Sequence, residues 1–429
     1  MPKEENEVIN YFKKFLSSNK MNIMERCYKT IRDKNQNRYF DDSIKKLSTE
    51  EFDSYFPMVS AVILTANKFE CDSLNYIFSA QKNSDIYKRN TNLPIFNSNN
   101  YCAPCAYIIK YKSFYILHLK AFETGSNTPG GSTDLVRLII NNKLLMPKCI
   151  ISFGICYGRD PKKQEIGNVL IPKKLYPWSI GQKISENGFK IKHDDFNLNL
   201  EREFGEKTDL YSHARTFCDG EDGKTYVEKL NICKMNEDDT NECEFSIKVN
   251  LCNMSTGEAV VSSKDLKKHI ENATAILEEK GGEMEGYGIA KECLYYADIP
   301  CLIIKAICDW GELKNIDIEL KKENISVPEH FKDKLQAYAA FCAGICLNKY
   351  FDEYIIPNSK LSIIKWMADK KRGGNICNNY NHVDKETIIK NISNFYSVQK
   401  SDAEIILKNF IKHNFIELHN STNTYTTNN

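Results

Sequence analysis

The chain has 429 residues, a formal net charge of +1 and a hydrophobic fraction of 42%. A charge this close to zero gives no electrostatic case for binding nucleic acid or a membrane surface through the whole protein. No apolar run reaches the roughly 18 residues of a membrane span, and the polar start MPKEENEVIN lacks the apolar core of a signal peptide. We therefore expect a cytoplasmic protein with one large domain and accessory segments.

The 16 cysteines are scattered, and many stand inside apolar runs. This distribution is typical of reduced, buried thiols rather than of a disulfide framework. Cys102 and Cys105 form a CxxC pair. A zinc site needs a second pair of ligands at a suitable spacing, and none is evident. The sequence therefore predicts neither a metal nor a cofactor.

The chain divides into three parts. Residues 1–56 show apolar residues at helical spacing and predict a helical N-terminal segment. Residues 57–356 alternate short β-branched runs with helical patterns, which predicts an α/β domain. Residues 357–429 differ again, and three helical patterns followed by a short hairpin predict a winged-helix-like domain (363–368, 385–396, 400–415, then 415–418 with 425–427).

The first strand of the α/β part is predicted over residues 59–66 (VSAVILTA), and a helix is predicted over 71–78. Glu70 stands between them, at the edge of the sheet where α/β proteins bind ligands. A carboxylate at this position can hold and polarise a water molecule. An ordinary role in the first turn of a helix is the alternative for Glu70 taken alone.

A second strand is predicted over residues 148–153. It leads into a glycine-flanked turn, Gly154 to Gly158, and then into a basic stretch. Before this strand, a Gly-containing loop (residues 123–132) runs into a predicted helix. Such a loop is either an anion site at a helix N-terminus or a plain flexible connection.

The most informative stretch runs from Gly281 to Gly311. Glu283, Met284 and Glu285 open a predicted helix, residues 301–307 form an apolar strand, and Asp309 follows it. The carboxylates at the helix start can accept hydrogen bonds from a sugar diol. A separate carboxylic acid, kept protonated in a partly dry pocket, can donate to a ring nitrogen of a purine.

The ordered motifs resemble the nucleoside phosphorylase superfamily, and within it the methylthioadenosine/adenosylhomocysteine nucleosidase branch most closely. The resemblance covers residues 57 to about 350 and rests on Glu-Met-Glu, a small residue, an Ala-containing helix, a proline, an apolar strand and an aspartate. It implies a three-layer α/β domain with a mixed central sheet, and it implies a homo-oligomer.

The resemblance also assigns roles to individual residues. Asp309 would be the general acid toward the purine, and Glu70 would orient the attacking water. Glu285, with the backbone of Met284, would hold the ribose hydroxyls, supported by Glu283. Cys308 stands where nucleosidases usually have serine, which is a better hydrogen-bond donor.

Further positions follow from the same resemblance. Gly154, Ile155 and Cys156 would lie against the base and ribose, as would Val260 and Val261 after the turn Ser255-Thr256-Gly257. Many nucleosidases have an aromatic residue at the place of Val260. Hexameric phosphorylases grip phosphate with an arginine and a serine where this chain has Ser152 and Ile155. Water is therefore the expected nucleophile.

The expected reaction is hydrolysis of the base–ribose bond of a purine nucleoside or nucleotide. Flanking segments of this kind resemble nucleosidase effectors of bacterial antiviral systems, which favours regulated cleavage of an adenine nucleotide such as ATP. Arg159, Lys162 and Lys163 are the candidate phosphate contacts. A regulatory protein would dock on the N- or C-terminal segment, and for the C-terminal domain protein contact is favoured over DNA binding.

Three alternatives stay open. A phosphorylase would bind phosphate through other residues and would require it for turnover. A housekeeping nucleosidase would cleave methylthioadenosine and be harmless when overexpressed. A non-enzymatic nucleotide sensor would bind without turnover, and its C-terminal domain would bind DNA in a salt-dependent manner.

Overall fold

The computed structural model describes residues 7–32, 44–80, 84–89, 105–111, 114–121, 125, 130–142, 144–145, 147–178, 182–185, 188–191, 197–205, 209–220, 222–233, 242–257, 267–268, 270, 279–297, 299–311, 316–355, 383–396, 398–412, 416–419 and 424–427. The helices are α1 (Glu7–Leu16), α2 (Lys20–Arg32), α4 (Thr49–Asp53), η1 (Phe56–Met58), α5 (Lys68–Ser79), α6 (Ser132–Asn141), α7 (Leu200–Gly205), α8 (Leu210–Phe217), α10 (Gly286–Glu292), η3 (Cys293–Ala297), α11 (Ile316–Lys322), α12 (Phe331–Tyr350), η4 (Phe351–Ile355), α15 (Lys385–Tyr396) and α16 (Lys400–Lys412). The strands are β1 (Lys45–Leu47), β2 (Val59–Thr65), β3 (Ser84–Arg89), β4 (Cys105–Tyr111), β5 (Phe114–Lys120), β6 (Cys149–Gly158), β7 (Val169–Pro177), β8 (Gln182–Ser185), β9 (Gly188–Ile191), β10 (Leu198–Asn199), β11 (Lys224–Asn231), β12 (Glu242–Thr256), β13 (Glu279–Glu283), β14 (Cys301–Asp309), β15 (Val383–Asp384), β16 (Ile416–His419) and β17 (Thr424–Thr427).

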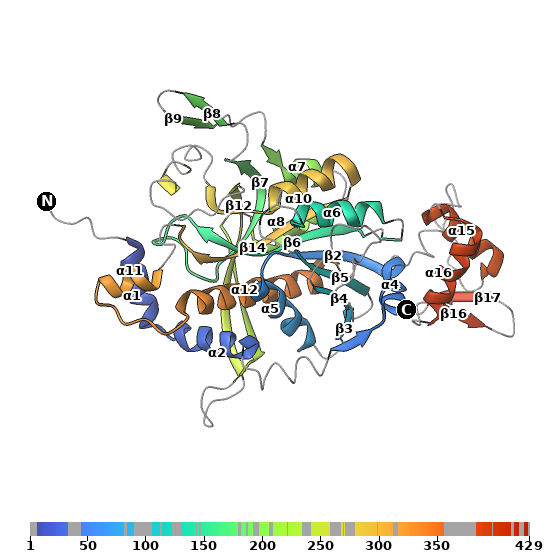
Figure 1. The fold of residues 1–429 in the computed structure, drawn as a ribbon, viewed down its shortest axis with the longest axis horizontal. Coiled ribbons are helices and arrows are strands. Elements are labelled where there is room, and N and C mark those ends of the chain that lie inside the picture. The colour runs from blue at the N-terminus through green and yellow to red at the C-terminus, as the bar shows by residue number, and fades with distance from the viewer. Residues whose placement is uncertain are drawn as a thin grey trace.

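A mixed 12-stranded sheet forms the middle layer of the protein. Its main path runs β1-β3-β4-β5-β2-β6-β13-β12-β7-β10, while β11 pairs with β12 and β14 pairs with β6 and β7. Figure 1 shows α5 and α12 on one side of this sheet and α6 and α10 on the other. The expected three-layer α/β architecture with a mixed sheet is confirmed.

Strands β2, β6 and β14 build the centre of the sheet. β6 runs parallel to β2 and to β14, so the carboxyl ends of all three strands meet at one edge. Their apolar residues are buried because helices cover both faces, and Val62, Ile151 and Ile304 are 0% exposed. Side chains that follow these strands therefore come together at one edge of the sheet.

Two predicted boundaries were wrong at this edge. Strand β6 continues through Gly158, where the sequence predicted a turn from Gly154. Residues 279–283 form strand β13 and pair with β6, whereas a helix start had been predicted at Glu283. A Cβ at Gly281 would lie 2.4 Å from the carbonyl oxygen of Tyr157, so β13 reaches β6 only because glycine stands there.

The N-terminal segment is part of this core rather than a purely helical extension. Strand β1 joins the sheet edge by pairing in parallel with β3. The Arg26 Nε of α2 donates to the carbonyl oxygen of Cys233 at 2.8 Å, and the ring of Phe12 lies 5.7 Å from that of Phe331 in α12. The expected helices are present as α1 and α2, and strand β1 was not foreseen.

The C-terminal part contains α15 and α16 and a separate three-stranded sheet in the order β15-β17-β16. These elements fall where two helices and a hairpin were predicted, and the predicted helix over 363–368 lies outside the described residues. The winged-helix assignment and the domain boundaries stay predictions. Among the helices that the structure describes, none is long and apolar enough to cross a membrane.

Candidate active site

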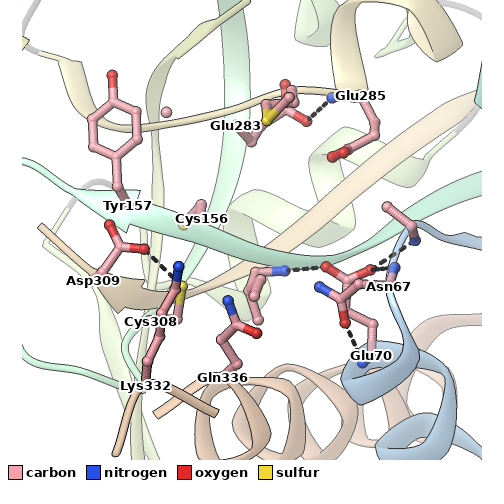
Figure 2. Close-up of a pocket in the computed structure, with 14 residues that line it drawn as sticks. Asn67, Glu70, Cys156, Tyr157, Glu283, Glu285, Cys308, Asp309, Lys332 and Gln336 are labelled. Carbon is pink, nitrogen blue, oxygen red and sulfur yellow. Dashed lines mark hydrogen bonds between the residues drawn. The ribbon is translucent and has the colours of Figure 1, made fainter. Parts of the chain in front are cut away.

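A pocket of about 220 Å³ opens at the carboxyl ends of β2, β6 and β14. Figure 2 shows Asp309 on one side of this pocket and Glu70 on the other, with Glu283 and Glu285 along a third side. The lining residues come from five segments: Ala66, Asn67, Glu70; Ile155, Cys156, Tyr157; Gly282, Glu283, Met284, Glu285; Cys308, Asp309; Lys332 and Gln336.

Glu70 is held in place on its side of the pocket by several hydrogen bonds. Asn67 caps helix α5 and accepts a hydrogen bond from the Glu70 amide, while the Glu70 side chain returns to the cap as in a capping box. Its Oε2 accepts from the amides of Ala66 (2.7 Å) and Asn67 (3.0 Å), and its Oε1 accepts from the amide of Ile155 (3.1 Å). Glu70 is therefore both a helix-capping acid and a residue of the pocket.

The close approach of Glu70 to β6 depends on Gly154. A Cβ at Gly154 would lie 2.3 Å from the Glu70 Oε1, so any side chain there would displace the carboxylate. Glu70 is only 2% exposed. Burial raises the pKa of its carboxyl group, and the positive charge of Lys305 opposes that rise.

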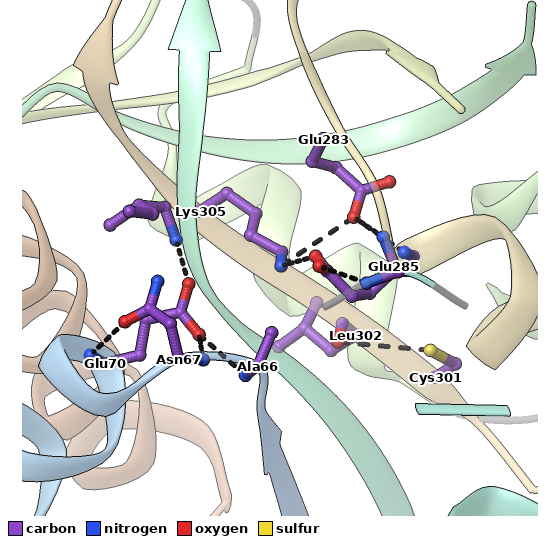
Figure 3. A network of polar contacts seen from close by, with 11 residues as sticks. Ala66, Asn67, Glu70, Glu283, Glu285, Cys301, Leu302 and Lys305 are labelled. Atoms are coloured by element: carbon purple, nitrogen blue, oxygen red, sulfur yellow. Dashed lines mark hydrogen bonds and ion pairs between the residues drawn. The ribbon is translucent and has the colours of Figure 1, made fainter. Parts of the chain in front are cut away.

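Lys305 is a buried cation in the middle of β14, and it contacts two carboxylates that line the pocket (Figure 3). Its Nζ lies 2.9 Å from Glu285 Oε2 and 3.7 Å from Glu283 Oε2, and its side chain is 1% exposed. Burial by itself lowers the pKa of Lys305. The negative charges of Glu285, Glu283 and Glu70 raise it by a larger amount, so the pKa of Lys305 lies well above its usual range. Lys305 is therefore protonated and compensates the buried carboxylates.

The two glutamates of the Glu-Met-Glu motif have different local tasks. Glu283 Oε2 accepts from the amides of Glu285 (2.8 Å) and Gly286 (2.6 Å) and thereby fixes the start of α10. Glu285 Oε1 accepts from the amide of Gly125 at 3.2 Å, and its Oε2 accepts from Lys305. Burial raises the pKa of Glu283, and Lys305 opposes that rise. Glu285 keeps lone pairs that can accept from a vicinal diol in the pocket.

Asp309 enters the pocket because β14 is bulged at its end. Neighbouring residues of a regular strand point to opposite faces, yet Cys308 and Asp309 both line the pocket. The pairing with β6 shifts register between Ile307 and Asp309, which leaves Cys308 as the extra residue. Bulges of this kind commonly redirect side chains beside active sites.

The surroundings of Asp309 favour its protonated form. Burial raises the pKa of its carboxyl group, while the amide of Gly311 (2.7 Å to Oδ1) and the thiol of Cys308 (3.3 Å to Oδ2) oppose the rise. Burial also raises the pKa of Cys308, so this thiol is a neutral, weak donor. The site thus places two acids whose pKa is raised by burial, Asp309 and Glu70, in the same small pocket.

The structure brings most of the expected site residues together and separates a few. Eight of them line the pocket: Glu70, Ile155, Cys156, Glu283, Met284, Glu285, Cys308 and Asp309. Gly154 lies directly against Glu70. Val260 and Val261 lie outside the described residues.

The expected phosphate contacts do not line the pocket. Arg159 donates to the carbonyl oxygen of Glu279 at 3.1 Å. Lys162 pairs with Glu7 of α1 at 2.6 Å, and Lys163 lies 3.7 Å from Asp160. Lys162 and Lys163 line a second cleft of about 330 Å³ beside α1. The positions of Arg159, Lys162 and Lys163 in the sequence, shortly after β6, could not show whether their side chains point toward the pocket or away from it.

Among the residues that sequence reasoning did not assign to the site are three lining residues, Tyr157, Lys332 and Gln336, and the buried Lys305. One signal was present for Lys305, because a lysine inside an apolar strand is rarely buried without a charged partner. Tyr157 brings an aromatic ring to the pocket, whereas the resemblance to nucleosidases pointed to an aromatic residue only at the place of Val260. Lys332 and Gln336 come from α12, more than 20 residues after Asp309, and only the fold brings them here.

The chain is 25% identical over 211 residues to a "Death domain-containing ATP nucleosidase" of the sponge Amphimedon queenslandica. The match covers 48% of this chain and spans 37% of the length of that protein. The resemblance to nucleosidases inferred from the sequence motifs is confirmed by this similarity. No protein-family model matches the chain.

Solved structures of nucleosidases also match the chain at low identity. The native futalosine hydrolase of Helicobacter pylori strain 26695 is 14% identical, with a TM-score of 0.45, and the match covers 69% of this chain and 98% of that one. The 5′-methylthioadenosine/S-adenosyl homocysteine nucleosidase of Campylobacter jejuni is 17% identical, with a TM-score of 0.42 and coverages of 68% and 98%.

Proposed function

We propose that the protein is a purine N-glycosidase that hydrolyses the base–ribose bond of an adenine nucleotide. The observation that carries this proposal is the pocket itself. It combines Asp309, whose pKa burial raises, with a firmly held Glu70 carboxylate and the Glu283–Glu285 segment. Those are the groups needed to protonate a leaving base, hold a water molecule and bind a ribose diol.

The chemistry balances with these residues alone. The oxygen of a water molecule forms a bond to C1′ while the C1′–N9 bond breaks and its electron pair moves into the purine. Asp309 donates its proton to N7 of the leaving base, and Glu70 accepts a proton from the water. Glu285 accepts hydrogen bonds from the ribose hydroxyls. The products are the free base and the ribose with its 5′ substituent.

Water is favoured over phosphate as the nucleophile by the charge of the pocket. Three carboxylates, Glu70, Glu283 and Glu285, surround the single cation Lys305 in this buried network. A phosphate anion placed beside Glu70 would meet repulsion in a low-dielectric site. The Ile155 amide, which could otherwise serve an oxyanion, is bound to Glu70.

The choice of an adenine nucleotide is supported by the sponge ATP nucleosidase that the chain resembles.

Removal of adenine from ATP would deplete the cell's nucleotide pool, so the activity of such an enzyme must be restrained. We propose that the N-terminal segment supplies this restraint, and the proposal is supported by the Tyr11 ring of α1, which lies 4.8 Å from the ring of Trp310, the neighbour of Asp309. A protein that docks on α1 would act through Trp310. A Tyr11→Ala variant with unchanged kcat would contradict this route.

The proposed reaction is tested by incubating the protein with adenosine, AMP, ATP, GTP and methylthioadenosine, with and without phosphate. Free base is followed by chromatography. We expect adenine release that needs no phosphate and that Asp309→Asn abolishes, while the control Asp160→Asn, which changes an aspartate outside the pocket, retains it. Strict dependence on added phosphate would establish a phosphorylase instead. Nucleotide binding without base release would indicate a sensor.

A further inference from the structure

Helix α12 brings a lysine to the mouth of the pocket. Lys332 and Gln336 lie one turn apart on the same face of α12, and both line the cavity. Lys332 is exposed, whereas Glu70, Glu283 and Glu285 are buried. Lys332 belongs to the first turn of a 20-residue helix, whose N-terminal end also favours negative charge.

Lys332 differs from the other charged residues that line the pocket in the sign of its charge. Of the described residues that line the cavity, Lys332 is the one cationic side chain, and it forms no ion pair with any described residue. Lys305 is occupied by Glu285 at 2.9 Å and is 1% exposed. An ammonium group at the rim is therefore available for an anionic part of the substrate, while the interior of the pocket repels one.

The position of Lys332 fits the 5′ end of a nucleotide. Figure 2 shows Lys332 beside Cys308 and Asp309, and the positive charge of Lys332 opposes the rise in the pKa of Asp309. Asp309 faces the imidazole edge of the purine in the proposed reaction. In the anti conformation this edge of the purine lies above C5′ of the ribose. The 5′ substituent of the substrate therefore extends out of the pocket near Asp309.

We propose that Lys332 binds the 5′-phosphate group of the substrate and makes the protein prefer nucleotides over nucleosides. This inference rests on the proposed function and names the residue that selects its substrate class. The phosphate group shared by AMP and ATP is the recognised feature. A charge-assisted contact of this type contributes about 10- to 100-fold to kcat/KM.

The test compares Lys332→Met with Lys163→Met. Both variants remove one positive charge and keep an apolar stem, but the Lys163 side chain is 80% exposed and lies outside the pocket. Initial rates of adenine release are measured for adenosine, AMP and ATP at one ionic strength. We expect Lys332→Met to lower kcat/KM for AMP and ATP by about 10-fold or more relative to kcat/KM for adenosine, and Lys332→Arg to restore most of this difference. Lys163→Met should resemble the wild type.

The outcomes separate this inference from the proposed function. An equal loss for adenosine, AMP and ATP would show that Lys332 acts through Asp309 rather than on phosphate, and would overturn the inference. Unchanged kinetics for all three substrates would overturn it as well. In both cases the proposed function would stand, because the wild type still releases base. Absence of base release by the wild type from every substrate would overturn both.

Discussion

Replacement of Lys305 by methionine tests the central charge network. The change keeps an apolar stem of similar length and removes the cation that faces Glu285 at 2.9 Å and Glu283 at 3.7 Å. Removing one partner of a buried ion pair typically costs about 3–5 kcal/mol, because the other charge stays buried without compensation. Natural domains are stable by about 5–15 kcal/mol, so we expect a large loss in the free energy of unfolding.

Urea unfolding at pH 7, followed by circular dichroism, measures this effect. The control is Lys163→Met, which breaks an exposed contact of 3.7 Å with Asp160 and should cost under about 1 kcal/mol. The double variant Lys305→Met with Glu285→Gln should recover part of the loss, since it removes one of the uncompensated charges.

The pH dependence gives an independent check. Burial raises the pKa of Glu283, and Lys305 opposes this rise, so the lysine's removal raises the pKa further. A carboxyl group with a raised folded-state pKa contributes stability that is present at low pH and lost as pH rises through that pKa. The difference in the free energy of unfolding between the wild type and Lys305→Met should therefore become smaller as pH falls toward 5. A loss under about 1 kcal/mol at pH 7, or a deficit that grows on acidification, would refute the assignment of Lys305 as the compensating cation.

Gly154→Ala should lower kcat for base release by about 100-fold, because its Cβ would displace the Glu70 carboxylate, whereas Gly205→Ala, which meets no atom within 4 Å, should not. Retained kcat in the first variant would exclude Glu70 from the chemistry. Asp309→Asn should lower base release by at least about 100-fold. The same variant should be more stable than the wild type at neutral pH in thermal unfolding, since the raised pKa of Asp309 makes its ionised form unfavourable in the fold above that pKa. Cys308→Ser should shift the alkaline limb of the kcat–pH profile to lower pH, because a hydroxyl is a better donor than the thiol 3.3 Å from Asp309 and lowers its pKa. An unshifted limb would show that Cys308 does not tune the acid.

Much of the site was predictable because its residues stand next to strongly patterned elements. The apolar run that forms β2 and the cap of α5 place Glu70 at the sheet edge, and the apolar run of β14 places Asp309 there as well. Local patterns specify such elements, and parallel strands then align their carboxyl ends. The order of motifs was therefore enough to predict the three-layer fold.

The errors and omissions share a long-range origin. The start of α10 was placed too early because the pairing of β13 with β6 depends on contacts between segments more than 100 residues apart. The bulge at Cys308 arises from register against β6 and leaves no mark in the local sequence. Arg159, Lys162 and Lys163 follow a site strand, yet the loop turns them toward Glu279, Glu7 and Asp160.

The sequence by itself determined the α/β class and the acids near the strand ends, because both depend on residue type and short-range periodicity. Only the tertiary structure showed Lys305 in contact with the buried carboxylates and Lys332 at the pocket. The physical reason is that the strength of an ionic interaction is set by distance and burial in space. Neither quantity can be obtained from positions along the chain until the sheet and α12 have been assembled.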